Sequence, residues 1–456
     1  SPVITILKLS VRLTEGFFMG NDRYNAVVVG AGPAGSTAAL MMARNNLSVA
    51  LIERGKYPGS KNMTGGTIAS MPFQQILPEY WNIQGIPLER RIVSDELWLL
   101  DNDSAVRIGF TGKKFGMAPY NKHTILRYKF DRWYADQAVK AGAKLFTNCL
   151  AVDLVYHKTG PLSKKVDGVM LEGGDVIHAD VVILAEGAQA ALTQKAGLRK
   201  RLKPNEMTLY VKEVLELPAE KIEDRFNLEK DEGASIGMVG YPPSPAIGKG
   251  GIWTNRDSLS IVVGGYLNQI VGKGLNPLQL LERFKGHPLV KRLIQGAKPV
   301  KYMGHIIPKG GFKKIPTLVD DGIIVVGDAA EMISGRRGMD LAMITGKYAA
   351  EAAAQACALD RYGRDILSSY EERVKGSFFY QNMKKGKNVE VYFNKFQDAD
   401  FLITKAVNDF AYKYFEQNLD TDKNNLIKML EELINMQPLG KSAKDVLFGL
   451  QNWGVL

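Results

Sequence analysis

The segment YNAVVVGAGPAGSTAALMMARNNLSVALIE, residues 24–53, decides the fold. A short apolar run leads into a glycine-rich loop, an alanine- and methionine-rich stretch follows, and a second apolar, β-branched run ends at Glu53. This order predicts strand, loop, helix and strand, the unit that binds a dinucleotide. Gly30 permits the tight turn, Gly32 lets backbone approach a pyrophosphate, and Gly35 lets the helix pack on the strand. Glu53 is placed to accept hydrogen bonds from ribose hydroxyls.

A second signal lies far downstream and indicates which dinucleotide binds. An apolar strand predicted at 322–326 runs into Gly327-Asp328, and an aspartate there can bond the ribityl hydroxyls of an extended flavin. Taken alone, this aspartate could instead serve a turn or cap a helix. A long alanine-rich helix begins near Gly338-Met339, and its N-terminal N–H groups would point at the flavin pyrimidine ring. Together these features indicate FAD rather than NAD.

Composition limits the remaining classes. At 456 residues, with 45% hydrophobic and 23% charged residues, the chain has the composition of an ordinary globular protein. Lys and Arg exceed Asp and Glu by 59 − 48 = 11, which suits a phosphate-bearing ligand, an anionic membrane surface or an acidic partner, although a solvated basic surface accounts for it as well. RNA-recognition and helix-turn-helix signatures are absent, so we expect no nucleic-acid partner.

Cysteine usage and hydropathy exclude further classes. The only two cysteines, Cys149 and Cys357, are remote in sequence and cannot supply the roughly four thiolate ligands of a cubane cluster or a structural zinc, so we expect no metal site. Their scarcity favours a reducing, cytoplasmic environment. No stretch approaches the roughly 18 apolar residues of a membrane span, so any membrane contact is expected to be peripheral.

Several further segments, in this order, resemble those of one family. They are GSKNMTGG at 59–66, ILR at 125–127, FDRW at 130–133, AEG at 185–187, VKEV at 211–214, GGIW at 250–253, NP at 276–277 and FKGHP at 284–288. Over nearly all of residues 24–360 the chain resembles the FixC proteins and the electron-transfer-flavoprotein:quinone oxidoreductases, within the glutathione-reductase-type FAD superfamily.

The predicted architecture is α/β. A discontinuous, Rossmann-like FAD-binding domain carries an inserted, mostly antiparallel β domain that the resemblance makes the quinone (substrate) domain, and a helical C-terminal tail follows. The boundaries are an N-terminal arm at 1–23, FAD-binding parts at 24–95, 121–200 and 311–360, a quinone- and membrane-facing insertion at 96–120, the β-rich domain at 201–310, and a partner-docking region at 361–456.

The motifs and the resemblance together assign the site residues. The expected FAD contacts are Gly30, Gly32, Pro33, Ala34, Gly35, Glu53, Arg54, Lys61, Asn62, Met63, Thr64, Gly65, Gly66, Arg127, Ala151, Val152, Glu186, Gly187, Gly327, Asp328, Gly338 and Met339. The expected quinone contacts are Phe115, Tyr120, Gly250 and Gly251. No catalytic acid, base or nucleophile is assigned, because electron transfer needs none. The five histidines are scattered and expected at the surface or in turns.

The resemblance also implies partners and a location. Relatives with a fused C-terminal domain hold an iron–sulfur cluster on clustered cysteines, and this chain has no cysteine after Cys357. It therefore resembles the FixC type, for which we expect the α and β subunits of an electron transfer flavoprotein, a separate ferredoxin-like iron–sulfur subunit and a membrane quinone. The apolar loop 115–120, flanked by lysines, predicts peripheral contact with the inner face of the cell membrane.

Two other kinds of function are compatible with motifs of this type. A geranylgeranyl-reductase-type enzyme, or an NAD(P)H-dependent flavin reductase or hydroxylase acting on a lipid-like substrate, shares the FAD motifs. A hydroxylase favours Asp-Gly where this chain has Glu186-Gly187, and a second glycine-rich dinucleotide motif is absent. A non-catalytic lipid carrier on the same fold would lose the FAD elements, and this chain retains them.

Overall fold

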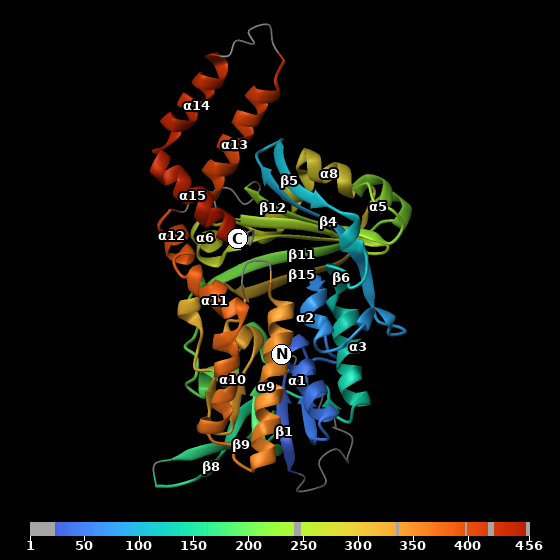
Figure 1. The fold of residues 1–456 in the computed structure, drawn as a ribbon, viewed down its shortest axis with the longest axis vertical. Helices are drawn as coiled ribbons and strands as arrows, with labels where there is room; N and C mark the ends of the chain where they lie inside the picture. Colours follow the sequence, from blue (N-terminus) through green and yellow to red (C-terminus); the bar gives the residue numbers. More distant parts are fainter. Residues whose placement is uncertain are drawn as a thin grey trace, which may run out of the picture.

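The computed structural model of the protein describes residues 23–161, 163–240, 248–333, 337–396, 399–417 and 424–452. Except for Arg23, the predicted N-terminal arm lies outside these residues. The predicted fold class is confirmed: a Rossmann-like sheet with its helices lies below a second, mostly antiparallel sheet, and a helical C-terminal region runs along both (Figure 1).

The first sheet is built on the segment that opens the sequence. Its strand order is β16-β17-β10-β1-β2-β7, and all neighbours except β16 and β17 run parallel. The β8–β9 hairpin extends β10. The strands are β1 (Tyr24–Val29), β2 (Val49–Ile52), β7 (Lys144–Phe146), β8 (Ala151–Lys158), β9 (Lys164–Leu171), β10 (Val176–Leu184), β16 (Val319–Asp320) and β17 (Ile323–Val325).

The second sheet has the order β15-β11-β14-β13-β12-β4-β6-β3, with β5 paired to β4. Its only parallel pair among the described strands is β4 with β12. Sheet pairing places β3 and β4 here, although the sequence groups residues 24–95 with the FAD-binding domain. The strands are β3 (Thr64–Ala69), β4 (Leu88–Leu100), β5 (Ala105–Thr111), β6 (Lys122–Leu126), β11 (Met207–Glu216), β12 (Glu232–Gly240), β13 (Gly248–Thr254), β14 (Ser258–Tyr266) and β15 (Lys298–Pro308).

Two long helices pack closely against the first sheet. α1 (Pro33–Arg44) follows the glycine loop, and α9 (Met339–Leu359) lies alongside it. A Cβ atom added to Gly346 would lie 2.2 Å from the backbone oxygen of Ala34, so the two helix backbones touch at this point. α3 (Arg127–Lys140) packs against α1, and α10 (Arg364–Gly376) packs against α9.

The two faces of the second sheet have different roles. One face packs against a group of helices, burying residues such as Val211, Ile261 and Val263 against Leu281 and Phe284 of α7. Because side chains alternate along a strand, the neighbours of these core residues point to the other face, toward the first sheet. The helices on the core face are α5 (Ala219–Phe226), α6 (Leu267–Gly272), α7 (Pro277–Gly286) and α8 (Pro288–Ile294).

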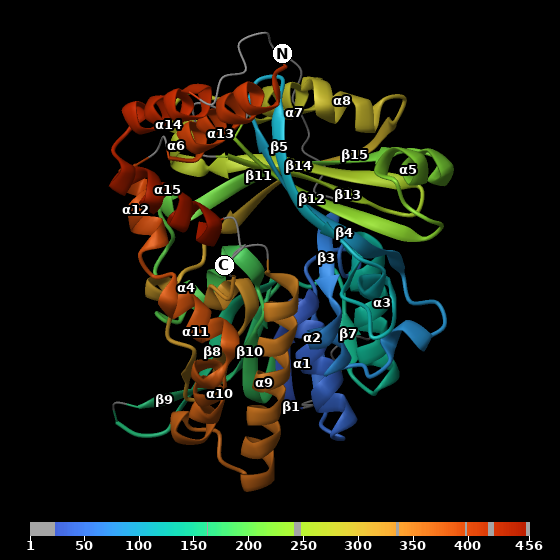
Figure 2. The same ribbon diagram turned by 45° about the horizontal axis from the view of Figure 1, so that its top comes forward.

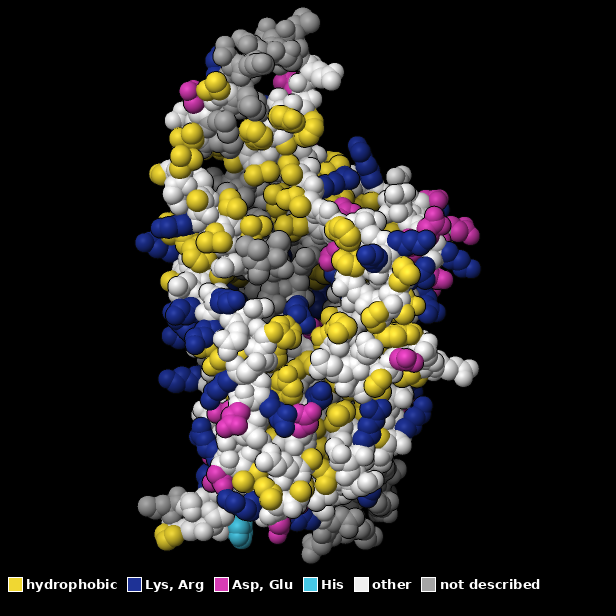
Figure 3. Space-filling model, viewed as in Figure 1, with side chains coloured by type: hydrophobic (Ala, Val, Ile, Leu, Met, Phe, Trp, Pro, Cys, Tyr) yellow, Lys and Arg dark blue, Asp and Glu magenta, His cyan; other side chains and the backbone are white. Residues whose placement is uncertain are grey.

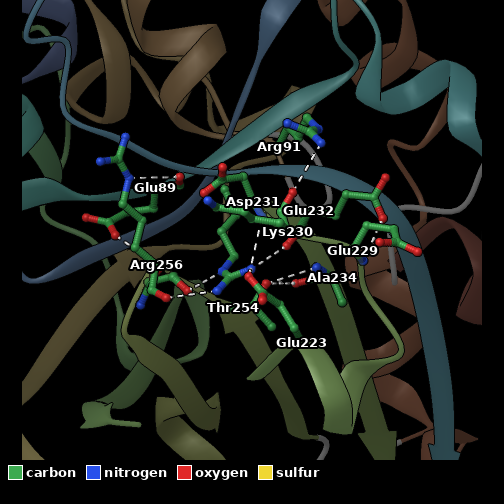
Figure 4. A network of polar contacts seen from close by, with 12 residues as sticks. Glu89, Arg91, Glu223, Glu229, Lys230, Asp231, Glu232, Ala234, Thr254 and Arg256 are labelled. Carbon is green, nitrogen blue, oxygen red and sulfur yellow. Dashed lines mark hydrogen bonds and ion pairs between the residues drawn. The ribbon is translucent and has the colours of Figure 1, made fainter. Parts of the chain in front are cut away.

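A buried polar network ties one end of this sheet together (Figure 4). The Arg90 side chain is 2% exposed; its Nη1 atom donates to the Glu223 carboxylate at 2.8 Å and to the Glu232 backbone oxygen at 2.9 Å. Its Nε atom donates to the Asn255 backbone oxygen at 2.7 Å. The Arg90 hydrogen bond lowers the pKa of Glu223. The network therefore joins β4, α5 and the β13–β14 turn.

The C-terminal helices cover part of the face that points toward the first sheet (Figure 2). Val407 and Leu450 pack against Leu97, Leu99 and Val239 of β4 and β12. These helices are α11 (Phe378–Lys385), α12 (Val389–Lys395), α13 (Ala399–Phe415), α14 (Asn424–Met436) and α15 (Leu439–Asn452).

A short loop separates β7 from β8. β7 ends at Phe146 and β8 begins at Ala151, and between them Asn148 has φ +54°. The Cys149 amide donates to the Glu53 backbone oxygen at 3.0 Å. Backbone hydrogen bonds to the segment after β2 therefore continue beyond the end of β7, before the chain turns into β8.

The contact between α1 and α9 predicts a stability difference between two helical glycines. Gly346→Ala should lower the free energy of unfolding by about 1–3 kcal/mol, because the added methyl group meets backbone that cannot rotate away. Gly286→Ala, at the end of α7, is the control: nothing lies within 4 Å of an added Cβ. Urea unfolding of both variants measures the difference, and equal stability would contradict the packing.

Candidate FAD and substrate site

A cavity of about 1700 Å³ joins the two sheets. One part lies at the carboxyl ends of β1, β2 and β10, where open α/β sheets bind their ligands. The other part is walled by the second sheet, through residues such as Tyr210, Trp253 and Val262. Segments far apart in sequence thus enclose one space.

The glycine loop has the geometry that a pyrophosphate requires. Gly30 has φ +105°, and an added Cβ would lie 2.4 Å from the Ala185 backbone oxygen; a Cβ on Gly35 would lie 1.9 Å from the Gly30 oxygen. Gly32, in contrast, has ordinary backbone angles, and the nearest atom to an added Cβ is Arg127 Nη2 at 3.7 Å. Gly32 therefore borders open space at the N-terminus of α1, where free N–H groups favour phosphate.

Two carboxylates beside this loop are held in defined positions. Glu53 accepts hydrogen bonds from the Ala31 amide at 3.2 Å and the Gly55 amide at 2.6 Å, so it is oriented at the end of β2 as a ribose acceptor must be. Asp131 is buried and bound by Arg127, whose Nε donates at 2.7 Å and Nη2 at 2.6 Å. Burial lowers the pKa of Arg127, but the Asp131 carboxylate more than offsets this and raises it, so Arg127 remains a cation in the groove.

The loop after β17 is held in place by hydrogen bonds to α9 and to Arg199. Gly327 has φ +63°, and its amide donates to the Thr345 hydroxyl at 3.1 Å. Arg199 donates through Nη1 to the backbone oxygens of Asp328 at 3.3 Å and Ala329 at 3.2 Å, and it pairs with the buried Glu331. Asp328 lines the cavity, and burial raises its pKa despite nearby cations. These contacts hold the loop in place, with Asp328 at the wall of the cavity.

The start of α9 completes this wall. Gly338 is the residue before the first turn, and both Gly338 and Met339 line the cavity. The Arg337 Nε donates to Asp340 at 2.6 Å, on the first turn of the helix. The N-terminal end of α9 therefore borders the cavity, where its dipole favours negative charge.

The family segment 59–66 borders the cavity only in part. Lys61, Asn62 and Gly66 line it, and a Cβ on Gly66 would lie 3.2 Å from the Trp253 ring. Met63 is buried elsewhere, in a small core of the second sheet, although its backbone oxygen accepts from the Arg127 amide at 2.8 Å. Thr64 and Gly65 belong to β3.

Two of the predicted FAD residues make hydrogen bonds within the protein. The Glu186 carboxylate accepts from the amides of Leu192 at 2.8 Å and Thr193 at 2.9 Å, so it caps α4 (Ala191–Lys195), and both Glu186 and Gly187 line the cavity. The Val152 backbone oxygen accepts from Lys195 Nζ at 2.6 Å, and Val152 does not line the cavity.

The remaining predicted FAD residues do line the cavity. Arg54 lies at its edge and donates to the Gln189 side chain at 2.5 Å, and Ala151 lies at the start of β8. Besides the residues of the preceding paragraphs, the predicted residues that line the cavity are Pro33, Ala34, Arg54 and Ala151.

The structure does not bring the four predicted quinone-contacting residues together at one place. The Phe115 ring packs on Phe110 with ring centres 5.0 Å apart, Tyr120 packs edge-on against Trp81, and neither Phe115 nor Tyr120 lines the cavity. Gly250 contributes backbone, but an added Cβ there would meet Phe284 on the core face at 2.9 Å. A Cβ on Gly251 would point to the cavity face, 3.0 Å from the Trp253 ring.

Sequence reasoning missed two cavity residues, Lys212 on β11 and His305 on β15. Burial, with a smaller contribution from nearby Arg127, lowers the pKa of Lys212 to about 8. Burial, with Lys212, Arg127 and Arg54 nearby, lowers the pKa of His305 to about 3. The VKEV segment at 211–214 contains Lys212 but gives no sign of which face of the strand the lysine occupies.

The expectation for the histidines is also wrong for His123, which is buried on β6, whereas His287 lies in the turn between α7 and α8 as expected. His123 is 6% exposed and hydrogen-bonds the Tyr80 hydroxyl at 3.0 Å. His287 is 1% exposed and caps α8 while its Nε2 contacts the Asp101 backbone oxygen at 2.9 Å. In the described ranges, no three or more His, Cys, Asp or Glu side chains are grouped to hold a metal ion.

Comparison with known proteins agrees with this geometry. Residues 25–225 match the family model described as FAD dependent oxidoreductase. Solved structures with similar folds include a geranylgeranyl bacteriochlorophyll reductase-like protein from Thermoplasma acidophilum (TM-score 0.68, 19% identity, covering 91% of this chain and 98% of that one). A mutant of the halogenase PltM in complex with FAD is also similar (TM-score 0.61, 13% identity, 93% and 85% covered).

The fold and the groove define an FAD-dependent oxidoreductase. Among curated proteins, Protein FixC of Azorhizobium caulinodans is 37% identical over 422 residues, covering 91% of this chain and 96% of its own. Protein FixC of Escherichia coli is 37% identical over 361 residues, covering 78% and 82%. The chain belongs to the FixC family.

The open space beside Gly32 predicts a variant that folds but loses FAD. Gly32→Val should leave the urea unfolding of the FAD-free protein nearly unchanged, because the structure has room for it. The branched side chain would occupy the pyrophosphate position and weaken FAD binding at least about tenfold, or ~1.4 kcal/mol. Flavin absorbance per chain measures occupancy, with Gly376→Val, an open helix-end glycine away from the cavity, as the control. Full occupancy in Gly32→Val would overturn the assignment.

From the surroundings of His305 we predict that its imidazole stays neutral in the folded protein. Its pKa of about 3 in the folded protein lies below the roughly 6.5 of an unfolded chain. Between these values only the unfolded chain gains the proton, so this residue reduces stability as the pH falls below about 6.5. NMR of the imidazole, assigned with His305→Gln, should show no titration from pH 8 to 5. A midpoint near 6.5 would contradict the buried position.

Proposed function

We propose that this chain is the FAD subunit of a FixC-type electron-transfer complex. It receives electrons from an electron transfer flavoprotein, through a separate ferredoxin-like iron–sulfur subunit, and passes them to a membrane quinone. The observation that supports this best is the shared cavity, in which the FAD groove opens directly onto a face of the second sheet that carries apolar side chains.

The two parts of the cavity suit two ligands. Bound FAD supplies the ability to accept and release one or two electrons. The residues around its groove bind and orient it, and the second-sheet part provides apolar contacts through Leu97, Val239, Val262 and Ile307. A flat, apolar ring such as a quinone fits such a wall, and transfer between adjacent rings needs no positioned acid or base.

The cysteines support a role for a separate cluster-bearing subunit. Cys149 lies beside the FAD groove and Cys357 lies in α9, and both are free thiols whose pKa is raised by burial. They belong to different parts of the first domain. A cluster in the complex must therefore be held by another chain.

An apolar surface supports a peripheral membrane contact. In the described part of the chain, no helix is both long and hydrophobic enough for a bilayer crossing. Hydrophobic side chains instead gather over α13, α14 and α15 (Figure 3), and α13 also contacts β5. The side chains exposed on these elements and the adjacent loop include Ile108, Phe110, Met117, Tyr412, Phe415, Ile427 and Leu439. Lys113 and Lys114, also exposed, flank the loop at 115–120 in sequence and suit anionic headgroups.

A second candidate is favoured by the fold similarity to a geranylgeranyl bacteriochlorophyll reductase-like protein. The same cavity can take a prenyl chain in place of a quinone, with NAD(P)H as the electron source. Anaerobic mixing with NAD(P)H separates the two functions, because rapid bleaching of the flavin by NAD(P)H alone favours the reductase.

Gly251 provides a direct test of the quinone position. Gly251→Leu should decrease quinone reduction by about tenfold or more, because overpacking of about 1–3 kcal/mol falls on the cavity face beside Trp253. FAD content and flavin reduction by the reconstituted partners should stay normal. Thermal unfolding of the variant checks that the sheet is intact, since an added Cβ also lies 3.0 Å from the Ile236 backbone oxygen. Normal quinone reduction in a folded variant would refute this position.

A further inference from the structure

Lys212 is a charged residue at the deep junction of the two domains. It lies in the middle of β11, paired with Val262 of β14 and with Met303 of β15. Its neighbour Val211 is buried in the core on the opposite face, so alternation directs Lys212 to the cavity. Because this position is enclosed by protein, the charge of the ammonium group acts more strongly on a neighbouring group than it would in bulk water.

The cavity contains identifiable charges around this lysine. Arg127 and Asp328 are among the groups whose charges act on Lys212. Arg127 is bound in two places to Asp131, and Asp328 stands on the braced loop after β17. His305, on the adjacent strand, is neutral over the physiological range, so it adds no second cation beside Lys212.

The direction of bound FAD follows from the groove. The pyrophosphate is set by Gly32 at the start of α1, and the adenosine ribose by Glu53 at the end of β2. The flavin end must then extend the other way, past Asp328 and the start of α9, where the second sheet closes the cavity. Lys212 lies on that closing wall.

We propose that the Lys212 ammonium stabilises the reduced, negatively charged form of the FAD ring and thereby raises its midpoint potential. Oxidised FAD takes up two electrons and one proton to become the singly negative hydroquinone. The lysine keeps its own proton throughout and forms no covalent bond, so its contribution is electrostatic. The inference rests on the FAD cofactor alone and holds whichever electron acceptor the protein uses.

The test is potentiometric. The FAD-loaded protein is reduced stepwise with dithionite against a reference dye, without partners or quinone. Lys212→Met should lower the two-electron midpoint potential by at least about 30 mV, the equivalent of a tenfold weaker preference for reduced over oxidised FAD. Lys212→Arg, which keeps the charge, should stay near the wild type. Lys249→Met is the matched control, a half-buried lysine on β13 that lines the cavity without acting on Arg127 or Asp328.

Packing and charge are separated by a further variant and a second measurement. If Lys212→Met does not fold, Lys212→Gln keeps a polar chain of similar length without the charge and should lower the potential in the same way. Sulfite adds to the oxidised flavin ring and leaves a negative charge on it, so its dissociation constant, read from the loss of flavin absorbance, should rise about tenfold in the uncharged variants. An unchanged potential and sulfite affinity in both, or an equal shift in Lys249→Met, would overturn the proposal.

Discussion

Backbone contact at a few glycines is the constraint on which the rest of the structure depends. Gly35 brings α1 against the turn at Gly30, and Gly346 brings α9 against α1. With these contacts made, the N-termini of both helices point into the same groove at the carboxyl ends of β1 and β2. A side chain at any of these positions would meet backbone and strain this packing, so the cofactor site and the domain core depend on the same contacts.

Buried charges in the groove serve mainly to hold backbone in place. Arg199, paired with Glu331, donates to the backbone that carries Asp328, and Glu186 caps α4. Arg127 is held by Asp131 before any ligand arrives. Such paired charges are strongly favoured over leaving one partner alone in the interior. The groove is therefore preorganised, and a ligand meets oriented groups without first having to order them.

The second sheet lets one strand serve two purposes. Val211 stabilises the core beneath α7, and the next residue, Lys212, faces the cavity. The C-terminal helices then cover the end of the cavity-facing surface, through Val407 and Leu450. The apolar side chains they expose outward place a hydrophobic surface beside β5, next to the domain that lines the cavity.

The sequence by itself determined the glycine loop, the acid at the end of β2, Gly327-Asp328 and the start of α9, because each depends on residues adjacent in the chain and on a local period. Only the tertiary structure decided that Gly250 and Gly251 face opposite sides, that Glu186 caps a helix, and that Lys212 and His305 meet in the cavity. The physical reason is that alternation along a strand defines two faces, while the packing of distant segments determines which face is buried in the core and which borders the ligand.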